Sequence, residues 1–171
     1  MKGRGIKVEV PTTNFAVLEM DNGALVSCNL SWDVFKHGQR PLEIHGTEGS
    51  LRCPDPNFFA GDVEYSEGRG DWQVVNARDQ PCSKPNHPDA DPVQANYRVL
   101  GVADLAAALK AKRQPRMSGR LGLHVLEVME AILKAGETGK SISIKSGERP
   151  AALSGAQTAK LLVDAKATVA G

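Results

Sequence analysis

Apolar and polar residues alternate along the first half of the chain, and a period of two is typical of β-strands that bury one face. The alternating stretches predict strands over residues 6–10, 15–20, 24–32, 42–45, 50–53, 63–66 and 72–75. Because most of these stretches follow one another across short polar turns, an antiparallel meander is the expected arrangement.

Two of the turns have distinctive residues. Asp21-Asn-Gly23 separates two alternating stretches and predicts a tight β-hairpin. Gly46 and Gly49 bracket a second turn, in which we expect at least one residue with positive φ. Pro54 and Pro56 should end the strand that follows, because proline fixes φ and has no amide hydrogen to donate.

Helical periodicity takes over in the second half of the chain. Residues 102–112 are rich in alanine and leucine and predict a first helix. Ser118 is a suitable N-cap for a longer helix that runs to Glu137, with Gly139 at its C′ position. The apolar stripe of this helix consists of Leu121, Val125, Val128, Met129 and Ile132.

Two short elements complete the second half: a final strand at residues 141–144 and a helix over residues 157–166. Strands that come first and helices that follow predict an α+β fold, with a mostly antiparallel open sheet and helices packed on one face. The chain has 171 residues, of which 41% are hydrophobic and 24% charged, as expected for one globular domain.

The charge and cysteine content exclude several classes of partner. A net charge of +1 gives no electrostatic case for nucleic acid, and no apolar run reaches the roughly 18 to 20 residues of a membrane span. Three cysteines without C-x-x-C spacing indicate neither a disulfide framework nor a zinc site. Reduced thiols and the absence of a signal-peptide pattern predict a cytoplasmic protein.

A group of basic residues suits either a phosphate site or, more simply, a solvated helix end: Lys110, Lys112, Arg113, Arg116 and Arg120.

Four residues are candidates for contact with a substrate. Trp32, Asp33 and His37 form the best local cluster, which combines an aromatic platform, a carboxylate and a titratable base. His45 alternates with Ile44 in a predicted strand and could face a cleft. The structural alternatives are a core tryptophan with two loop residues, and an exposed strand position for His45.

Other motifs give no catalytic machinery. His124 and Glu127 are three residues apart on a predicted helix, a spacing that suits two metal ligands, but a packed structural histidine is favoured and no metal is expected. Gly3-Arg-Gly5 and Gly68-Arg-Gly70 lack the third glycine and the strand-to-helix context of a dinucleotide loop. No G-x-S-x-G motif occurs. We therefore assign no catalytic residue and no cofactor site to this chain.

An ordered set of motifs resembles one protein family, that of glucose–fructose oxidoreductase, inositol dehydrogenase and the rhizopine-catabolism proteins (Gfo/Idh/MocA). The similarity extends from about residue 3 to Pro150. Its motifs are Gly5 to Thr13, Asp21-Asn-Gly23, Ser31-Trp-Asp-Val34, Glu43 to Leu51, Pro54-Asp-Pro-Asn57, Leu100 to Leu105, and Leu121 to Leu133 followed by Glu137-Thr-Gly139.

The resemblance implies the C-terminal domain of such an enzyme. Full members carry a Rossmann domain for NAD or NADP, a Glu-Lys-Pro lysine and an Asp/His pair on a helix at the domain junction. None of these occurs here, and Ser83-Lys-Pro85 lies in a polar loop instead of following a Rossmann strand. The chain is thus expected to begin after the junction helix and to be inactive alone.

In this interpretation, residues 1–150 form a substrate-binding and oligomerisation domain, and residues 151–171 add a helical segment. The parent enzyme would move hydride between a nicotinamide and a sugar or polyol. The expected partners are a second copy, bound through the sheet, the Rossmann domain of the parent enzyme and a sugar-like small molecule. The alternative function is a non-catalytic binding or assembly module of the same fold.

Overall fold

A computed structural model describes residue 5 and residues 7–75, 80–84, 86, 95–147 and 152–169. The described residues form six strands and then three helices, which confirms the predicted α+β class. They fall into two compact units. The first comprises Met1–Gly38 and Arg120–Glu148, and the second comprises Gln39–Gly119 and Arg149–Gly171.

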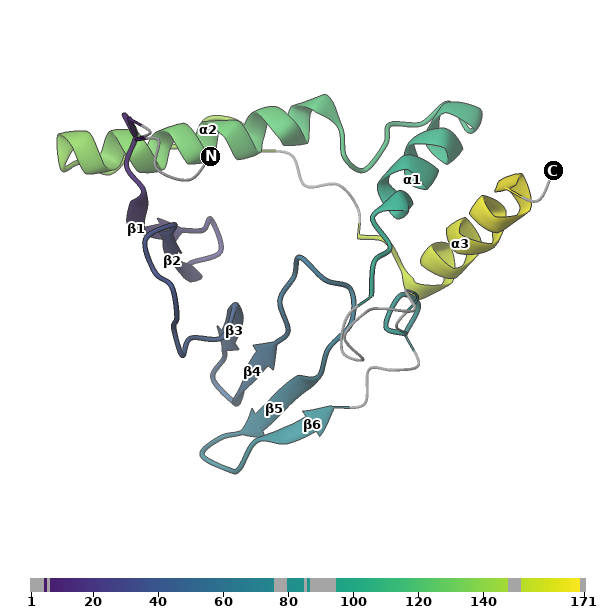
Figure 1. The fold of residues 1–171 in the computed structure, drawn as a ribbon, viewed down its shortest axis with the longest axis horizontal. Helices are drawn as coiled ribbons and strands as arrows, with labels where there is room; N and C mark the ends of the chain where they lie inside the picture. Colours follow the sequence, from purple (N-terminus) through teal and green to yellow (C-terminus); the bar gives the residue numbers. More distant parts are fainter. Residues whose placement is uncertain are drawn as a thin grey trace. The chain divides into compact units, whose positions relative to one another are not determined.

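The first unit contains the predicted hairpin. β1 (Thr13–Glu19) pairs antiparallel with β2 (Leu25–Ser31), and Thr13 lies opposite Ser31 (Figure 1). Gly23 has φ 83° and donates its amide to the Met20 carbonyl at 2.8 Å. A residue with a β-carbon is disfavoured in this left-handed conformation, so the glycine permits the tight turn.

The two faces of the hairpin differ in exposure. Along β1, Asn14, Ala16 and Leu18 are half-buried, whereas Phe15 and Val17 on the other face are 75% and 69% exposed. This alternation follows from the strand period of two. The hairpin therefore presents two large apolar side chains, Phe15 and Val17, that nothing within the described part of the first unit covers.

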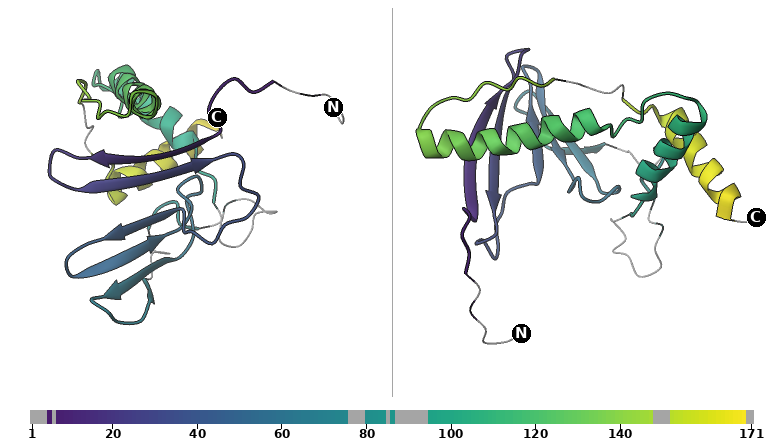
Figure 2. Two further views of the ribbon diagram at one scale, coloured as in Figure 1. Left: turned by 90° about the vertical axis from the view of Figure 1, so that its left-hand side faces the viewer. Right: turned by 90° about the horizontal axis from the view of Figure 1, so that it is seen from above.

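α2 (Gly119–Thr138) is the long helix of the first unit (Figure 2). It ends as predicted, because Gly139 has φ 63° and donates its amide to the Ala135 carbonyl at 2.8 Å. Its half-buried positions recur every three or four residues, and they are Leu121, His124, Glu127, Val128, Ala131, Ile132 and Ala135. The predicted stripe is therefore only partly right, since Val125 and Met129 are 48% and 58% exposed. The half-buried face of α2 therefore includes His124 and Glu127 in place of Val125 and Met129.

Two predicted strands are wrong. Residues 7–10 and 141–147 have no strand assignment, although both alternate in hydrophobicity. Alternation favours an extended chain, but a strand also needs a hydrogen-bonded neighbour. The amides of Lys145 and Ser146 instead donate to the side chain of Glu127, and Val8 and Val10 are exposed.

The second unit contains a four-stranded antiparallel sheet in the order β3-β4-β5-β6. Its strands are β3 (Leu42–His45), β4 (Gly49–Cys53), β5 (Val63–Glu67) and β6 (Gln73–Val75) (Figure 2). The predicted meander is confirmed for these four strands. β1 and β2 form a separate two-stranded sheet, and no ladder joins it to the other four described strands.

The β3–β4 turn corrects one expectation. Gly46 donates its amide to the Gly49 carbonyl at 2.9 Å, which closes the turn, but no residue from 46 to 49 has positive φ. A β-carbon on Gly49 would lie 2.5 Å from the Ser66 carbonyl oxygen and 2.8 Å from the Tyr65 ring. Glycine is therefore required at position 49 for the close approach of β5 and not for backbone conformation.

Two helices complete the second unit. α1 (Val99–Lys110) contacts α3 (Gly155–Val169), and Ala108 and Leu161 are buried there. α3 begins with a reciprocal cap, in which the Gln157 amide donates to Ser154 Oγ and the Ser154 amide donates to Gln157 Oε1. The helical segment predicted at the C-terminus is thus packed on α1.

Candidate functional site

Asp33 is fixed at the end of the β1–β2 hairpin. Its Oδ2 accepts hydrogen bonds from Thr12 Oγ1 at 2.5 Å and from Thr13 Oγ1 at 2.8 Å. The Asp33 amide donates to Ser31 Oγ at 3.1 Å, and the Trp32 amide donates to the Thr12 carbonyl at 2.9 Å. Thr13 and Ser31 are cross-strand partners whose hydroxyl oxygens are 2.7 Å apart. The hairpin register thus positions the carboxylate.

These contacts also set the charge of the carboxylate. Hydrogen bonds from Thr12 and then Thr13 stabilise the ionised form and lower the pKa of Asp33 from 3.8, against a small opposing effect of burial. Asp33 is therefore a hydrogen-bond acceptor at neutral pH and not a proton donor. The adjacent Trp32 side chain is 93% exposed, so the core-tryptophan alternative is wrong.

Sequence reasoning missed the threonines that hold Asp33. The predicted arms, residues 15–20 and 24–32, leave out Thr12 and Thr13, which come shortly before the first arm. The third predicted member of the cluster, His37, lies in the exposed loop after β2. Within the described residues no hydrogen bond joins His37 to Asp33, so the structure does not form a carboxylate–imidazole pair there.

His45 lies in the second unit and belongs to a different group of polar side chains. Its Nδ1 is 3.0 Å from the Oγ of its cross-strand partner Ser50, and its Nε2 is 4.0 Å from Glu43 Oε2. Arg52 Nε donates to Glu43 Oε1 at 3.0 Å, and the guanidinium lies 3.9 Å from the centre of the Trp72 ring. Strand alternation places Glu43, His45, Ser50 and Arg52 on one polar face of the sheet.

His124 and Glu127 hold the returning chain onto α2. The Glu127 carboxylate accepts the amides of Lys145 and Ser146 at 2.8 and 2.9 Å and also the Ser146 hydroxyl, while His124 Nδ1 lies 2.9 Å from Ser146 Oγ. The Ser146 hydroxyl and then these amides lower the pKa of Glu127 from 4.5 to about 2. Over the described chain, no three His, Cys, Asp or Glu side chains converge as a metal site would require.

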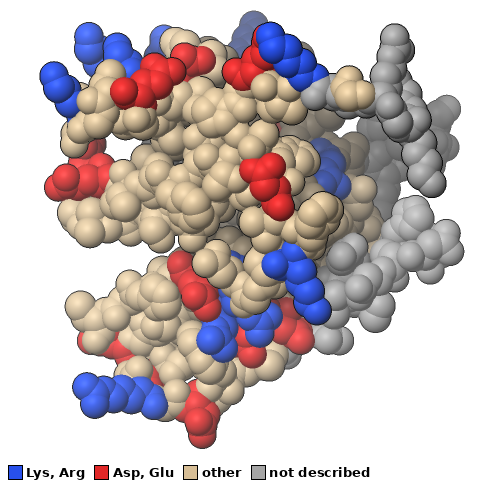
Figure 3. Space-filling view, turned by 60° about the vertical axis from the view of Figure 1, so that its left-hand side comes forward, with Lys and Arg blue, Asp and Glu red and all other residues tan. Residues whose placement is uncertain are grey.

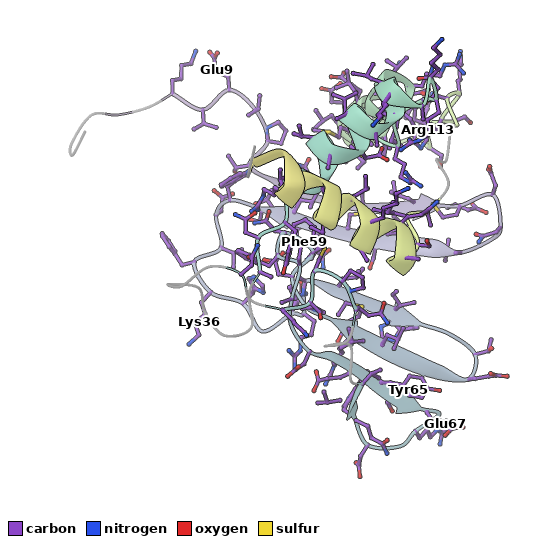
Figure 4. All side chains as sticks on the ribbon, turned by 90° about the vertical axis from the view of Figure 1, so that its right-hand side faces the viewer. Glu9, Lys36, Phe59, Tyr65, Glu67 and Arg113 are labelled. Carbon is purple, nitrogen blue, oxygen red and sulfur yellow. The ribbon has the colours of Figure 1, made fainter. Side chains whose placement is uncertain are left out.

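The basic group near α1 is engaged by a buried carboxylate. Asp104 accepts Arg113 Nη2 at 2.7 Å, Arg116 Nη1 at 2.6 Å and the Arg116 amide at 2.8 Å. Arg113 is close to the C-terminal end of α1 (Figure 4). Arg116 Nη2 also donates to Gln157 Oε1 at 3.1 Å, which connects α1 to the start of α3. These two arginines therefore stabilise the second unit and were not recognised as such from the sequence.

Burial and pairing act on Asp104 in opposite directions. Burial raises its pKa, but the hydrogen bonds from Arg113 and Arg116 and the positive charge of Arg113 outweigh it, and the pKa falls from 3.8 to about 2. On the face that Figure 3 shows, acidic and basic side chains are interspersed.

Comparison with known families decides the classification. The chain matches the model described as oxidoreductase family, C-terminal α/β domain (Gfo/Idh/MocA), over residues 7–144. The chain belongs to this oxidoreductase family. No curated protein and no solved structure matches it. The family match confirms the resemblance drawn from the sequence motifs, and α3 lies beyond the matched residues.

The glycine pair of this family domain does not have the setting of a dinucleotide loop. Gly68-Arg-Gly70 forms the turn between the antiparallel strands β5 and β6. The Gly68 amide donates to the Glu48 carbonyl and the Gly70 amide to the Glu67 carbonyl, both at 2.8 Å. A dinucleotide loop binds the pyrophosphate through free amides at the start of a helix. Most of the other glycine pair, Gly3-Arg-Gly5, lies outside the described residues.

Among the helices that the structure describes, none combines the length and the apolar character that crossing a membrane requires.

Proposed function

We propose that this Gfo/Idh/MocA domain contacts the substrate and forms the dimer surface of an NAD- or NADP-dependent sugar or polyol dehydrogenase. One observation carries the proposal: the carboxylate of Asp33 is held by two threonine hydroxyls, and the next residue back in the chain, Trp32, has an exposed side chain. A carboxylate accepts hydrogen bonds from hydroxyl groups, and an aromatic ring packs against the apolar C–H face of a sugar.

The residues have distinct roles in this proposal. Asp33 orients a substrate hydroxyl, and Trp32 covers one face of the carbon skeleton. Thr12 and Thr13 fix the carboxylate, so they position Asp33 and do not themselves need to touch the substrate. His45, with Ser50 beside it, is a second hydroxyl-binding candidate on the sheet of the other unit. His37 remains a candidate on its exposed loop.

The described residues do not fit the nicotinamide cofactor, since the Gly68 amide donates to the Glu48 carbonyl and the Gly70 amide to the Glu67 carbonyl. A bound NAD or NADP would accept or supply hydride at the substrate carbon. In our proposal that chemistry belongs to residues outside these 171, and this chain orients the substrate and shields it from water.

We place the protein in the cytoplasm on the basis of its three free thiols.

Replacing Asp33 tests the substrate contact. In the complete dehydrogenase that carries this domain, Asp33→Asn should raise KM for the hydroxylated substrate by about tenfold, because a charged hydrogen-bond acceptor becomes a neutral one. The exposed Asp21→Asn in the β1–β2 turn is the matched control and should leave KM unchanged. Steady-state kinetics with neutral sugars and polyols provide the measurement. Equal kinetics for the two variants would favour the assembly-module alternative.

The exposed hairpin face supports the second part of the proposal, a homodimer. Phe15, Val17 and Leu25 are 75%, 69% and 70% exposed, and all three lie on one face of β1–β2. Exposed apolar side chains that share one face favour association in water. We expect light scattering to give the mass of a dimer at tens of micromolar, and Phe15→Lys to shift the mass toward that of a monomer. A stable monomer before any substitution would contradict the expectation.

A further inference from the structure

Three residues form a closed ring of hydrogen bonds at the end of the β1–β2 hairpin that lies opposite its turn. The Asp33 amide donates to Ser31 Oγ at 3.1 Å, and Thr13 Oγ1 donates to Asp33 Oδ2 at 2.8 Å. The ring is closed by the Ser31 and Thr13 hydroxyl oxygens, which are 2.7 Å apart. All three residues belong to the first unit.

The direction of each hydrogen bond in the ring follows from the protons available. An ionised carboxylate has no proton to donate, so the hydroxyl proton of Thr13 is directed to Asp33. Thr13 must then accept at its 2.7 Å contact with Ser31, and Ser31 must donate. The Ser31 oxygen in turn accepts the Asp33 amide, which can only donate. Each proton of the ring therefore has a single place.

Ser31 thus acts on the Asp33 carboxylate through Thr13. Because Thr13 and Ser31 are cross-strand partners, the hairpin register brings their hydroxyl groups together. By donating to Thr13 Oγ1, Ser31 keeps the Thr13 proton directed to Asp33 and makes it a stronger donor, since hydrogen bonds in a chain polarise one another. Without the Ser31 hydroxyl, Thr13 is free to turn its proton toward water.

Thr12 adds a second hydroxyl to the same carboxylate oxygen. Thr12 Oγ1 donates to Asp33 Oδ2 at 2.5 Å, and the Trp32 amide donates to the Thr12 carbonyl at 2.9 Å, which keeps Thr12 beside the ring. Both threonine bonds end on Oδ2. Within the described residues, Oδ1 is therefore the oxygen of Asp33 that is left to a ligand, and an ionised oxygen accepts hydrogen bonds without offering one.

We propose that Ser31 is a positioning residue of the substrate contact: its hydroxyl orders the ring so that Asp33 presents Oδ1, as an acceptor only, to a hydrogen-bond donor of the ligand. Ser31 acts through Thr13 and does not itself need to touch the substrate. The inference rests on the proposed function for the ligand contact, but the order of the ring is a property of this chain and is measurable without a substrate.

Acid titration of the chain, followed by the ¹³C signal of the Asp33 carboxyl group, tests the order of the ring. Hydrogen bonds from Thr12 and then Thr13 lower the pKa of Asp33 from 3.8, and Ser31→Ala should raise it part of the way back, because the Thr13 proton is no longer held in place. Ser31→Thr keeps a hydroxyl and should keep the lowered pKa. Ser27→Ala, on the same face of β2, is the matched control and should not change it. An unchanged pKa in Ser31→Ala would overturn the proposal.

A second substitution shows whether Ser31 acts through Thr13. Thr13→Val is similar in shape and suits a strand, but it lacks the hydroxyl group. In this background Ser31→Ala should change the pKa of Asp33 no further, because the hydrogen bond between the two residues is already absent. An equal change in both backgrounds would contradict the inferred order and show that Ser31 acts directly on Asp33.

Steady-state kinetics of the complete dehydrogenase separate this inference from the proposed function. Ser31→Ala should raise KM by about threefold with kcat nearly unchanged, less than the roughly tenfold expected of Asp33→Asn, and Ser31→Thr should restore KM. If Asp33→Asn raises KM and Ser31→Ala does not, Ser31 is not a positioning residue. If Ser31→Ala raises the pKa of Asp33 while neither substitution changes KM, the proposed substrate contact fails although the ring is ordered as inferred.

Discussion

Asp104→Ala should lower the free energy of unfolding by about 3 kcal/mol, since it leaves two arginines without their buried partner. The Asp104 side chain is 8% exposed, and its oxygens accept three hydrogen bonds from Arg113 and Arg116. Arg113 is 39% exposed and regains water on substitution, which places the cost at the lower end for a broken buried pair.

Urea unfolding followed by circular dichroism measures this effect. Asp71→Ala is the matched control, because Asp71 is an exposed carboxylate of the same unit and its loss should cost less than about 0.5 kcal/mol. If Asp104→Ala and Asp71→Ala unfold at the same urea concentration, the buried network is not stabilising.

The same carboxylate gives a pH dependence of known sign. Because the pKa of Asp104 falls from 3.8 to about 2 in the folded chain, its stabilising contribution is complete above 3.8 and is lost as the pH falls toward 2. Asp104→Asn has no such group, so its stability should decline less over this window than that of the unsubstituted chain. A parallel decline would contradict the role of Asp104.

Gly49→Ala should be the second strongly destabilising change, with a cost of about 3 kcal/mol. The new β-carbon would lie 2.5 Å from the Ser66 carbonyl oxygen, and that backbone cannot move away without disturbing the β4–β5 ladder. The Tyr65 ring, 2.8 Å from the same point, adds a second clash.

Gly46 provides the control within the same turn. A β-carbon there would lie at an ordinary 3.5 Å from the Gly49 carbonyl oxygen, and Gly46 does not have positive φ. Gly46→Ala should therefore change the stability by less than about 0.5 kcal/mol. Thermal or urea unfolding of the two variants side by side is the measurement. Equal costs would show that the turn conformation matters and not the contact with β5.

Local signals in the sequence predicted the elements well. Asp21-Asn-Gly23 located the turn of the β1–β2 hairpin, and the alternation over 42–75 located four strands to within one or two residues. Gly139 marked the end of α2. These signals depend on residues that are neighbours in the chain, which explains why they can be recognised without a structure.

Contacts between distant residues could not be predicted in this way. Nothing near residues 141–144 indicates that Glu127 takes the amides that follow, and so a strand was predicted where the structure has none. The partnership of Asp104 with Arg113 and Arg116 depends on the path of the loop after α1. At the candidate site, Trp32 and Asp33 were predicted, but the threonine hydroxyls that hold the carboxylate follow from the hairpin register.

The central claim is that this family domain orients a substrate while the nicotinamide cofactor is bound by residues outside the chain. Calorimetric titration of the chain with NADH and with NADPH tests it most directly. We predict no measurable binding, because the Gly68 and Gly70 amides are bonded to the Glu48 and Glu67 carbonyls and provide no pyrophosphate site. A saturable isotherm with a dissociation constant at micromolar or below for either cofactor would contradict the claim.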